Sequence, residues 1–171
     1  QFGKHRKRSQ NTRRRILDAA TDMFLAEGYS TTNLEKVALA ANVTKPTVYS
    51  HFKSKRGLFD AVIKQNAEGR LAELSKFLVP SEDPRADLIS FGDFLMARVL
   101  NEETRRWDRL AAAESISHPE VGEAFYQAGP AQVVKGLTGY LKKQRSAGHL
   151  DAPHLERAAE QLIGLFLGLN L

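Results

Sequence analysis

Residues 43–55 read VTKPTVYSHFKSK, and the fold of the chain depends on what this stretch forms. Thr44 can cap a helix, and Pro46 is tolerated in a first helical turn because the amide groups there have no intrahelical partner. Val48 and Phe52 lie four residues apart and therefore share one helical face. The stretch predicts a short helix with an apolar inner face and a polar outer face, the latter made of Lys45, Thr47, Tyr49, Ser50 and His51.

Two helices are predicted before this stretch. Apolar residues recur at helical spacing over residues 11–27, and Gly28 stands where a left-handed residue would end the helix. Residues 29–41, YSTTNLEKVALAA, have one apolar helical face, and Thr32 with Glu35 matches the T-x-x-E capping box. Two short helices joined by a tight turn are therefore expected over residues 32–52.

The rest of the chain also has helical patterns. Ser54 is expected to cap a long fourth helix that Pro80 closes. No strand-like alternation and no internal repeat is found, so the predicted fold class is all-α with roughly nine helices. Five helices are expected after Pro80: those that start near Asp83, Asn101, Pro119 and Pro153, and one that carries Val133 to Leu141.

Composition and charge narrow the class of protein. The 171 residues are 42% apolar but contain no run long enough for a membrane span and no cysteine, which indicates a cytoplasmic protein. Residues 1–56 carry a net charge of +8 and residues 57–171 a net charge of −3. This asymmetry favours a nucleic-acid-binding domain over residues 1–56, joined to a helical domain over residues 57–171. A solvated basic tail is the alternative that charge alone leaves open.

The polar face of the predicted helix suits contact with DNA. The second helix of a helix-turn-helix enters the major groove, where Lys45 can donate to guanine and Thr47 can meet a base edge or a thymine methyl group. Tyr49, His51 and Lys55 offer donors to phosphates. From this stretch alone, a polar face turned to water is the favoured interpretation, and the flanking sequence decides between the two.

Four motifs in a fixed order point to one family. They are Thr32 before the second helix, V-x-K-x-T over residues 43–47, Y-x-H-F over residues 49–52, and Ser54 with Lys55. In order and spacing, the span from Thr12 to Ala61 resembles the tetracycline-repressor-like (TetR/AcrR) family of bacterial transcription regulators. The resemblance implies a three-helix DNA-binding head, joined by the long fourth helix to a C-terminal helical dimerisation and ligand-binding domain.

The resemblance also implies site residues and partners. The DNA contacts are base-reading positions, with Pro46 able to meet a thymine methyl group, and phosphate contacts: Thr32, Thr44, Lys45, Pro46, Thr47, Tyr49, His51 and Lys55. The C-terminal helices would pair two subunits, helped by the small residues Gly164 and Gly168, and enclose a small-molecule effector that is mostly apolar or aromatic. Ordinary core packing is the alternative for each suggested lining residue: Phe91, Phe94, Leu95, Trp107, Leu110, Phe125 and Tyr126, with Arg105, Arg106, Glu114 and His118 as polar contacts.

The function expected from these features is a DNA-binding regulator, a ligand-responsive repressor that binds a palindromic operator as a homodimer. The alternative is an enzyme or small-molecule carrier that uses the C-terminal helices. No metal-ligand spacing, cysteine nucleophile or phosphate-binding glycine loop is present, so no catalytic residue, metal or cofactor is predicted. RNA binding is disfavoured because stacking aromatic residues are sparse in the basic region. The basic arm, residues 3–15, is expected to be disordered and to attract DNA without sequence preference, although minor-groove insertion is possible.

Overall fold

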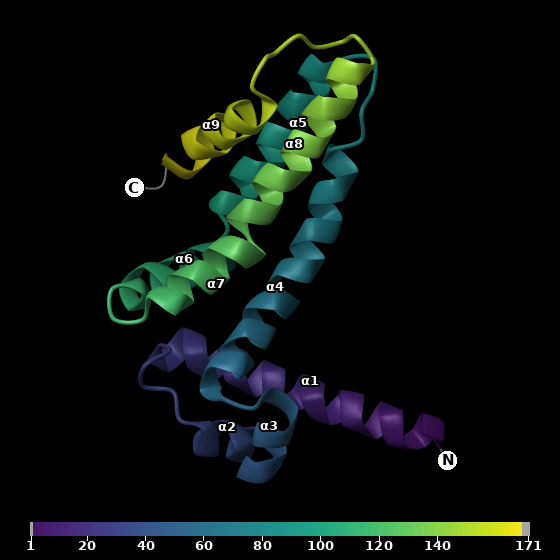
Figure 1. The fold of residues 1–171 in the computed structure, drawn as a ribbon. Coiled ribbons are helices and arrows are strands. Elements are labelled where there is room, and N and C mark those ends of the chain that lie inside the picture. The colour runs from purple at the N-terminus through teal and green to yellow at the C-terminus, as the bar shows by residue number, and fades with distance from the viewer. Residues whose placement is uncertain (1, 169–171) are drawn as a thin grey trace. The chain divides into compact units, whose positions relative to one another are not determined.

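The computed structural model describes the backbone of residues 2–168 and the side chains of residues 6–166. All the regular structure in this described part is helical (Figure 1), which confirms the all-α prediction. None of the described helices combines the length and apolar character that crossing a membrane requires. The nine helices are α1 (Phe2–Glu27), α2 (Leu34–Ala40), α3 (Lys45–Phe52), α4 (Lys55–Phe77), α5 (Pro84–Val99), α6 (Glu102–Ser115), α7 (Pro119–Ala128), α8 (Pro130–Ser146) and α9 (Leu155–Gly168).

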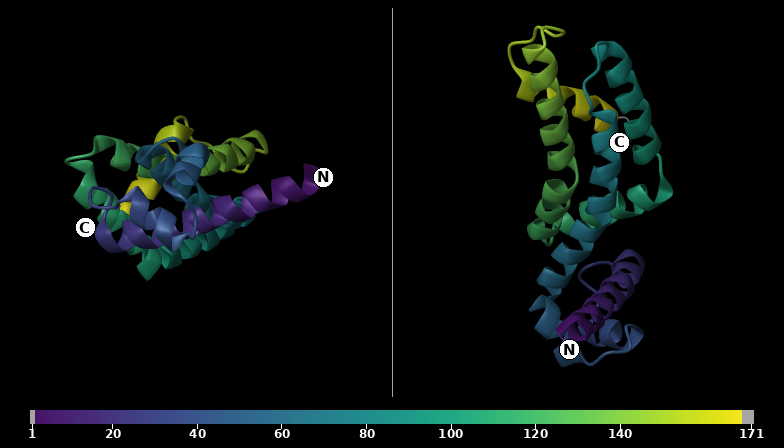
Figure 2. Two further views of the ribbon diagram at one scale, coloured as in Figure 1. Left: turned by 90° about the horizontal axis from the view of Figure 1, so that it is seen from below. Right: turned by 90° about the vertical axis from the view of Figure 1, so that its right-hand side faces the viewer.

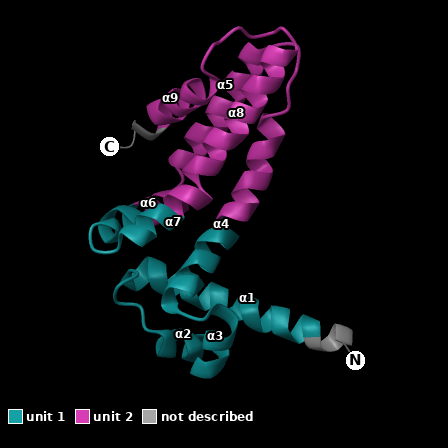
Figure 3. Cartoon of the chain, in the orientation of Figure 1, with its two compact units in different colours: residues 1–66, 109–124 teal, residues 67–108, 125–171 magenta. Residues whose placement is uncertain are grey.

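The helices form two compact units (Figure 3). The first unit, here called the head, contains residues 1–66 and 109–124; the second contains residues 67–108 and 125–171. The unit boundaries therefore fall inside α4, α6 and α7. The functional division at residue 56 stays a prediction, and these units differ from it because the end of α6 and most of α7 pack with the head.

The first helix begins earlier than expected. The arm over residues 3–15 was expected to be disordered, but in the structure it forms the first turns of α1. Lysine, arginine and glutamine are good helix formers, and they extend a helix that is already anchored by the fully buried Ile16 and Phe24. Gly28 ends α1 as predicted, with φ of +89° and its amide donating to the Phe24 carbonyl at 3.0 Å.

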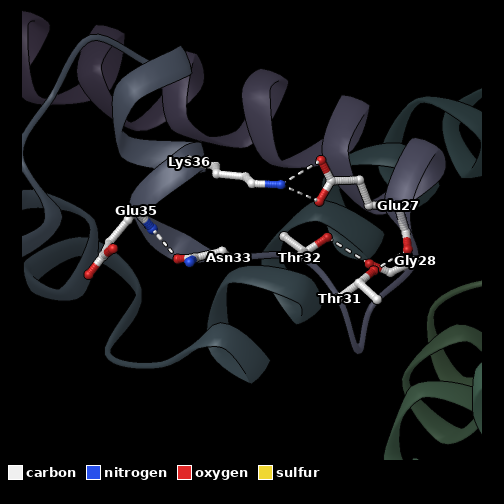
Figure 4. A network of polar contacts seen from close by, with 7 residues as sticks. All are labelled: Glu27, Gly28, Thr31, Thr32, Asn33, Glu35 and Lys36. Atoms are coloured by element: carbon white, nitrogen blue, oxygen red, sulfur yellow. Dashed lines mark hydrogen bonds and ion pairs between the residues drawn. The ribbon is translucent and has the colours of Figure 1, made fainter.

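The predicted capping box of α2 is wrong. The N-cap is Asn33, whose side-chain oxygen accepts from the Glu35 amide at 2.8 Å (Figure 4). The Thr32 hydroxyl instead donates to the Gly28 carbonyl at 2.6 Å, because its side chain is buried under the α1–α2 turn. The Glu35 side chain points away from Thr32 (Figure 4) and is free to contact another element.

The turn from α3 to α4 has an unusual backbone. Thr44 is the N-cap of α3 as predicted, but its hydroxyl contacts the Thr47 hydroxyl at 2.8 Å and makes no cap hydrogen bond. Lys53 has φ of +68°, and Ser54 caps α4 by accepting from the Gly57 amide at 3.0 Å. A Cβ on Gly57 would overlap the carbonyl oxygen of the preceding helix end, so this turn requires glycine at residue 57.

The head has an aromatic core. Phe59 of α4 makes edge-to-face contacts with Phe24 and Tyr29, with ring centroids 5.1 and 5.0 Å apart. Val48 and Phe52 of α3 are buried, as their four-residue spacing predicted. Their burial turns the polar residues of α3 away from the core.

The second unit is built around α5, α8 and α9, with the end of α4 against them. Helix α9 contacts both α8 and α5, and the right view of Figure 2 shows α8 and α5 on opposite sides, with α4 and α9 between them. Burying this core is a main source of stability, since each fully buried aliphatic or aromatic side chain contributes roughly 1.5–3 kcal/mol. The core contains Leu74, Phe91, Leu95, Val99, Leu137, Tyr140, Leu141, Leu155, Ala159 and Ile163.

A polar network closes one end of this core. The Tyr140 hydroxyl donates to the Asp87 carboxylate at 2.8 Å, and the Gln144 amide donates to the same carboxylate at 3.1 Å and to the Ser81 carbonyl at 2.9 Å. The Ser81 amide and hydroxyl also donate to Asp87, and these bonds, followed by those from Tyr140 and Gln144, lower the pKa of the carboxyl group. Burial raises the pKa of Tyr140 to about 12. No sequence pattern indicated this network.

Candidate nucleic-acid interface

The polar face of α3 is exposed in the structure. We use the name α3 polar face for Thr44, Lys45, Pro46, Thr47, Tyr49 and Ser50. The side chain of Lys45 is 47% exposed and Tyr49 is 43% exposed, whereas Val48 between them is 1% exposed. The helix therefore presents hydroxyl, ammonium and pyrrolidine groups together, which is the mixture that reads base edges in a major groove. Thr47 is half-buried and therefore less exposed than the other residues of this face, so it lies at the margin of the face.

An acidic residue stands beside this face. The Lys45 ammonium donates to the Glu35 carboxylate at 2.6 Å, which joins the first residue of α3 to the first turn of α2. The hydrogen bond raises the pKa of Lys45 and lowers the pKa of Glu35, so both groups are held in their charged forms. Glu35 had been expected to cap its own helix, and its contact with Lys45 was not predicted.

Lys55 is held by the α1–α2 turn. Its ammonium group donates to the Ser30 carbonyl at 2.7 Å and lies 5.0 Å from the centre of the Tyr29 ring. Partial burial lowers the pKa of Lys55, an effect that the negative charge of Glu114 opposes. The cation is thus positioned at the start of α4 before any phosphate arrives.

Two predicted contacts lie elsewhere. Thr32 is 3% exposed and its hydroxyl is used within the α1–α2 turn, so its side chain is not on the surface with the others. His51 is half-buried, and its ring packs beside Phe52 with centroids 6.0 Å apart. The structure therefore brings Thr44, Lys45, Pro46, Thr47 and Tyr49 together on one face, with Lys55 and His51 at the next turn and Thr32 underneath.

The head also contains a contact from far along the chain. Glu114 of α6 accepts from the Ser30 amide at 3.1 Å and from the Ser30 hydroxyl at 2.5 Å. Partial burial raises the pKa of Glu114, but the hydrogen bonds from Ser30 and from the Tyr29 amide together lower it below its ordinary value. The His118 ring packs edge-on against Tyr29, with centroids 5.2 Å apart. Glu114 and His118 had been suggested as effector contacts, but the structure places them in the head.

The suggested effector residues do not form one cluster. Phe91 and Leu95 belong to the core of the second unit, and Phe94 stacks on Phe77 with centroids 4.4 Å apart. Leu110 falls within the head, whereas Tyr126 is 50% exposed and Phe125 is half-buried in the second unit. Core packing, the alternative for each residue, describes Phe91 and Leu95 in this structure.

Among the suggested effector residues, Trp107 has a buried polar group without a hydrogen-bond partner. Its side chain is fully buried, and its indole N–H has no hydrogen-bond partner; the Thr104 hydroxyl, one turn earlier on α6, has none either. Buried donors without partners are costly, and they are rare in native structures.

Comparison with known proteins agrees with this architecture. Residues 16–62 match the family described as "Bacterial regulatory proteins, tetR family", and residues 86–169 match "AefR-like transcriptional repressor, C-terminal domain". The HTH-type transcriptional regulator YvkB of Bacillus subtilis (strain 168) is 34% identical over 157 residues, which cover 92% of this chain and 80% of YvkB.

Solved structures give the same result. A TetR-family transcriptional regulator from Mesorhizobium loti superposes with a TM-score of 0.81 at 28% identity, covering 95% of this chain and 82% of that one. The flavonoid-responsive regulator FrrA superposes with a TM-score of 0.76 at 27% identity, covering 90% of this chain and 78% of FrrA. The helix-turn-helix geometry, the two matched regions and these relatives agree, and the chain belongs to the TetR family of bacterial regulatory proteins.

Proposed function

We propose that this chain is a cytoplasmic transcriptional repressor that binds a palindromic operator as a homodimer and is released by a small-molecule effector. The observation that carries the proposal is that α3 buries its apolar side and exposes the α3 polar face. Lys55, the first residue of α4, is held nearby by its hydrogen bond to the Ser30 carbonyl. In a dimer, two such helices would enter successive major grooves about one helical turn apart. Lys45, Pro46 and Thr47 would read bases, and Thr44, Tyr49, His51 and Lys55 would contact the backbone.

The test is selection from random duplex DNA followed by titration of the selected site. A palindromic consensus should emerge, and its affinity should fall steeply with salt because each neutralised phosphate releases counterions. RNA of the same length serves as the competitor. Selection of no sequence, or equal affinity for RNA, would refute the DNA-binding proposal.

The dimer is supported by an exposed leucine on α9 that follows a glycine with open space around it. Leu165 is 70% exposed, and a Cβ added at Gly164 would meet nothing within 4 Å. An apolar side chain next to a small residue lets two helices approach closely. Gly168, the second small residue of the predicted pair, lies in α9, and its side-chain surroundings fall outside the described residues.

The effector proposal rests on α6. This helix carries Trp107 in the second unit and Glu114 in the head, two helical turns or about 10 Å apart along one axis. A ligand that accepts a hydrogen bond from Trp107 and shifts α6 would act directly on the contact between Glu114 and Ser30. The flavonoid-responsive relative supports an aromatic ligand bearing oxygen acceptors.

The effector proposal is tested by thermodynamic reciprocity. A ligand that weakens operator binding tenfold must itself bind tenfold more weakly in the presence of operator, which is about 1.4 kcal/mol in either direction. A ligand that binds saturably near Trp107 while operator leaves its affinity unchanged would show that this site is not the switch.

A further inference from the structure

The Glu35 carboxylate is out of place on a surface that only binds phosphates. Cationic side chains strengthen binding to the DNA phosphates and anionic side chains weaken it. The Glu35 side chain, which is 62% exposed beside Lys45, therefore lowers the general affinity for DNA. The Lys45–Glu35 pair also contributes little to folding, because exposed ion pairs are screened by water and lose side-chain entropy. Phosphate binding does not account for Glu35 at this position, and its place in the first turn of α2, where the helix dipole favours a carboxylate, contributes only about 0.3–1 kcal/mol.

Both members of the pair come from well-positioned backbone. Glu35 follows the Asn33 cap of α2, and Lys45 follows the Thr44 cap of α3. Their tips meet with the Lys45 nitrogen 2.6 Å from a Glu35 oxygen. The surface therefore offers a strong donor and a strong acceptor side by side, from two different helices.

One base-pair edge has the complementary arrangement. In the major groove a C·G pair presents the cytosine N4 amino donor next to the guanine O6 acceptor, with a second acceptor at guanine N7. Because N4 and O6 are hydrogen-bonded to each other within the pair, they lie about 2.9 Å apart. That spacing is close to the separation between the Glu35 oxygen and the Lys45 nitrogen.

We propose that Glu35 and Lys45 together read a single C·G pair in each half-site of the operator. Lys45 donates to guanine O6 and N7, and Glu35 accepts from cytosine N4 while holding the Lys45 ammonium in line. A T·A pair fits less well, since it gives the ammonium one acceptor beside the amino group and adds a methyl group. Glu35 also rejects pairs that place an acceptor opposite it, by repulsion. The inference rests on the proposed operator binding by α3.

The experiment uses the full chain and selection from a duplex library with randomised half-sites, for wild type, Glu35→Gln and Lys45→Met. The control is Glu27→Gln, which removes the same charge from another exposed ion pair of the head, with Lys36 at 3.3 Å. Wild type should select one C·G pair per half-site and lose about 10- to 100-fold in affinity when that pair becomes T·A. In Glu35→Gln this discrimination should fall several-fold, because the neutral amide keeps one weaker acceptor oxygen and no longer holds the Lys45 ammonium by charge, with the preferences at other positions unchanged.

The possible outcomes separate this inference from the proposed function. If wild type selects a palindrome and Glu35→Gln keeps the same C·G discrimination, the DNA-binding function stands and the inference is overturned. If Glu35→Gln and Glu27→Gln both raise affinity equally for all sequences, Glu35 acts only as a charge, which also overturns it. If wild type selects no sequence, the proposed function itself fails.

Discussion

Removing the Glu114 carboxylate should destabilise the DNA-binding head, although residue 114 lies far outside the helix-turn-helix. In Glu114→Ala, the Ser30 hydroxyl, the Ser30 amide and the Tyr29 amide lose their acceptor. Hydrogen bonds contribute about 0.5–1.5 kcal/mol each in net terms, and more to charged acceptors, but water replaces part of this at a partly exposed site. We therefore expect a loss of about 2 kcal/mol in the free energy of unfolding of the head. Glu114→Gln, which keeps one acceptor oxygen, should lose about half as much.

Amide hydrogen exchange is the direct assay because it reports on the turn itself. A loss of about 2 kcal/mol should speed exchange at Tyr29 and Ser30 by roughly 30-fold if they exchange through opening of the head. Operator binding should weaken as well, since the Ser30 carbonyl accepts from Lys55. Exchange rates in the core of the second unit should change little.

The matched control is Glu120→Gln. Glu120 carries the same charge in the same unit, but it contacts His118 at 3.4 Å and not the backbone of the α1–α2 turn. If Glu114→Ala leaves exchange at Tyr29 and Ser30 within a factor of two of wild type, or if Glu120→Gln has the same effect, the assigned role of Glu114 is wrong.

Four further outcomes are expected. Tyr49→Ala should weaken binding of all duplexes alike, whereas Lys45→Ala should relax base preference by about 1–3 kcal/mol, both measured by competition titration, and equal effects would contradict the division of roles. Leu165→Glu should give folded monomers by sedimentation, since this side chain is 70% exposed in the single chain, and an intact dimer would place the interface elsewhere. Asp87→Asn should lower stability at neutral pH but not in acid, because a lowered folded pKa stabilises above the ordinary aspartate value of about 3.9 and that contribution is lost as pH falls through the folded pKa; parallel curves of unfolding free energy against pH would disprove it. An aromatic ligand with oxygen acceptors should quench or shift Trp107 fluorescence in the concentration range that releases operator, and release without any change would move the ligand site away from Trp107.

Local backbone signals were sufficient for most helix limits. Gly28 and Pro119 mark an end and a start because their preferred dihedral angles act on neighbouring residues alone. The cap of α2 could not be chosen in this way. Thr32 and Asn33 are both good caps, and the choice depends on the Gly28 carbonyl that Thr32 meets once α1 has ended.

The part of the candidate site that depends on local patterns was also predictable. The four-residue spacing of Val48 and Phe52 correctly predicted which face of α3 is buried, and therefore that the α3 polar face points outward. The contact between Glu114 and Ser30 joins residues 84 positions apart, and no pattern of period two or 3.6 carries that information. Pairings of this kind are decided by the packing of whole helices.

The inclusion of residues 109–124 in the head limits how freely the two halves of this protein can be exchanged. Regulators of this architecture invite hybrid sensors, in which one protein's operator specificity is grafted onto another's ligand response at a single crossover in α4. Here such a graft would replace two side chains with foreign ones: Glu114, which accepts hydrogen bonds from Ser30, and Val121, which is fully buried. A working hybrid would have to carry the 109–124 segment along with the first 66 residues, as two pieces inserted together.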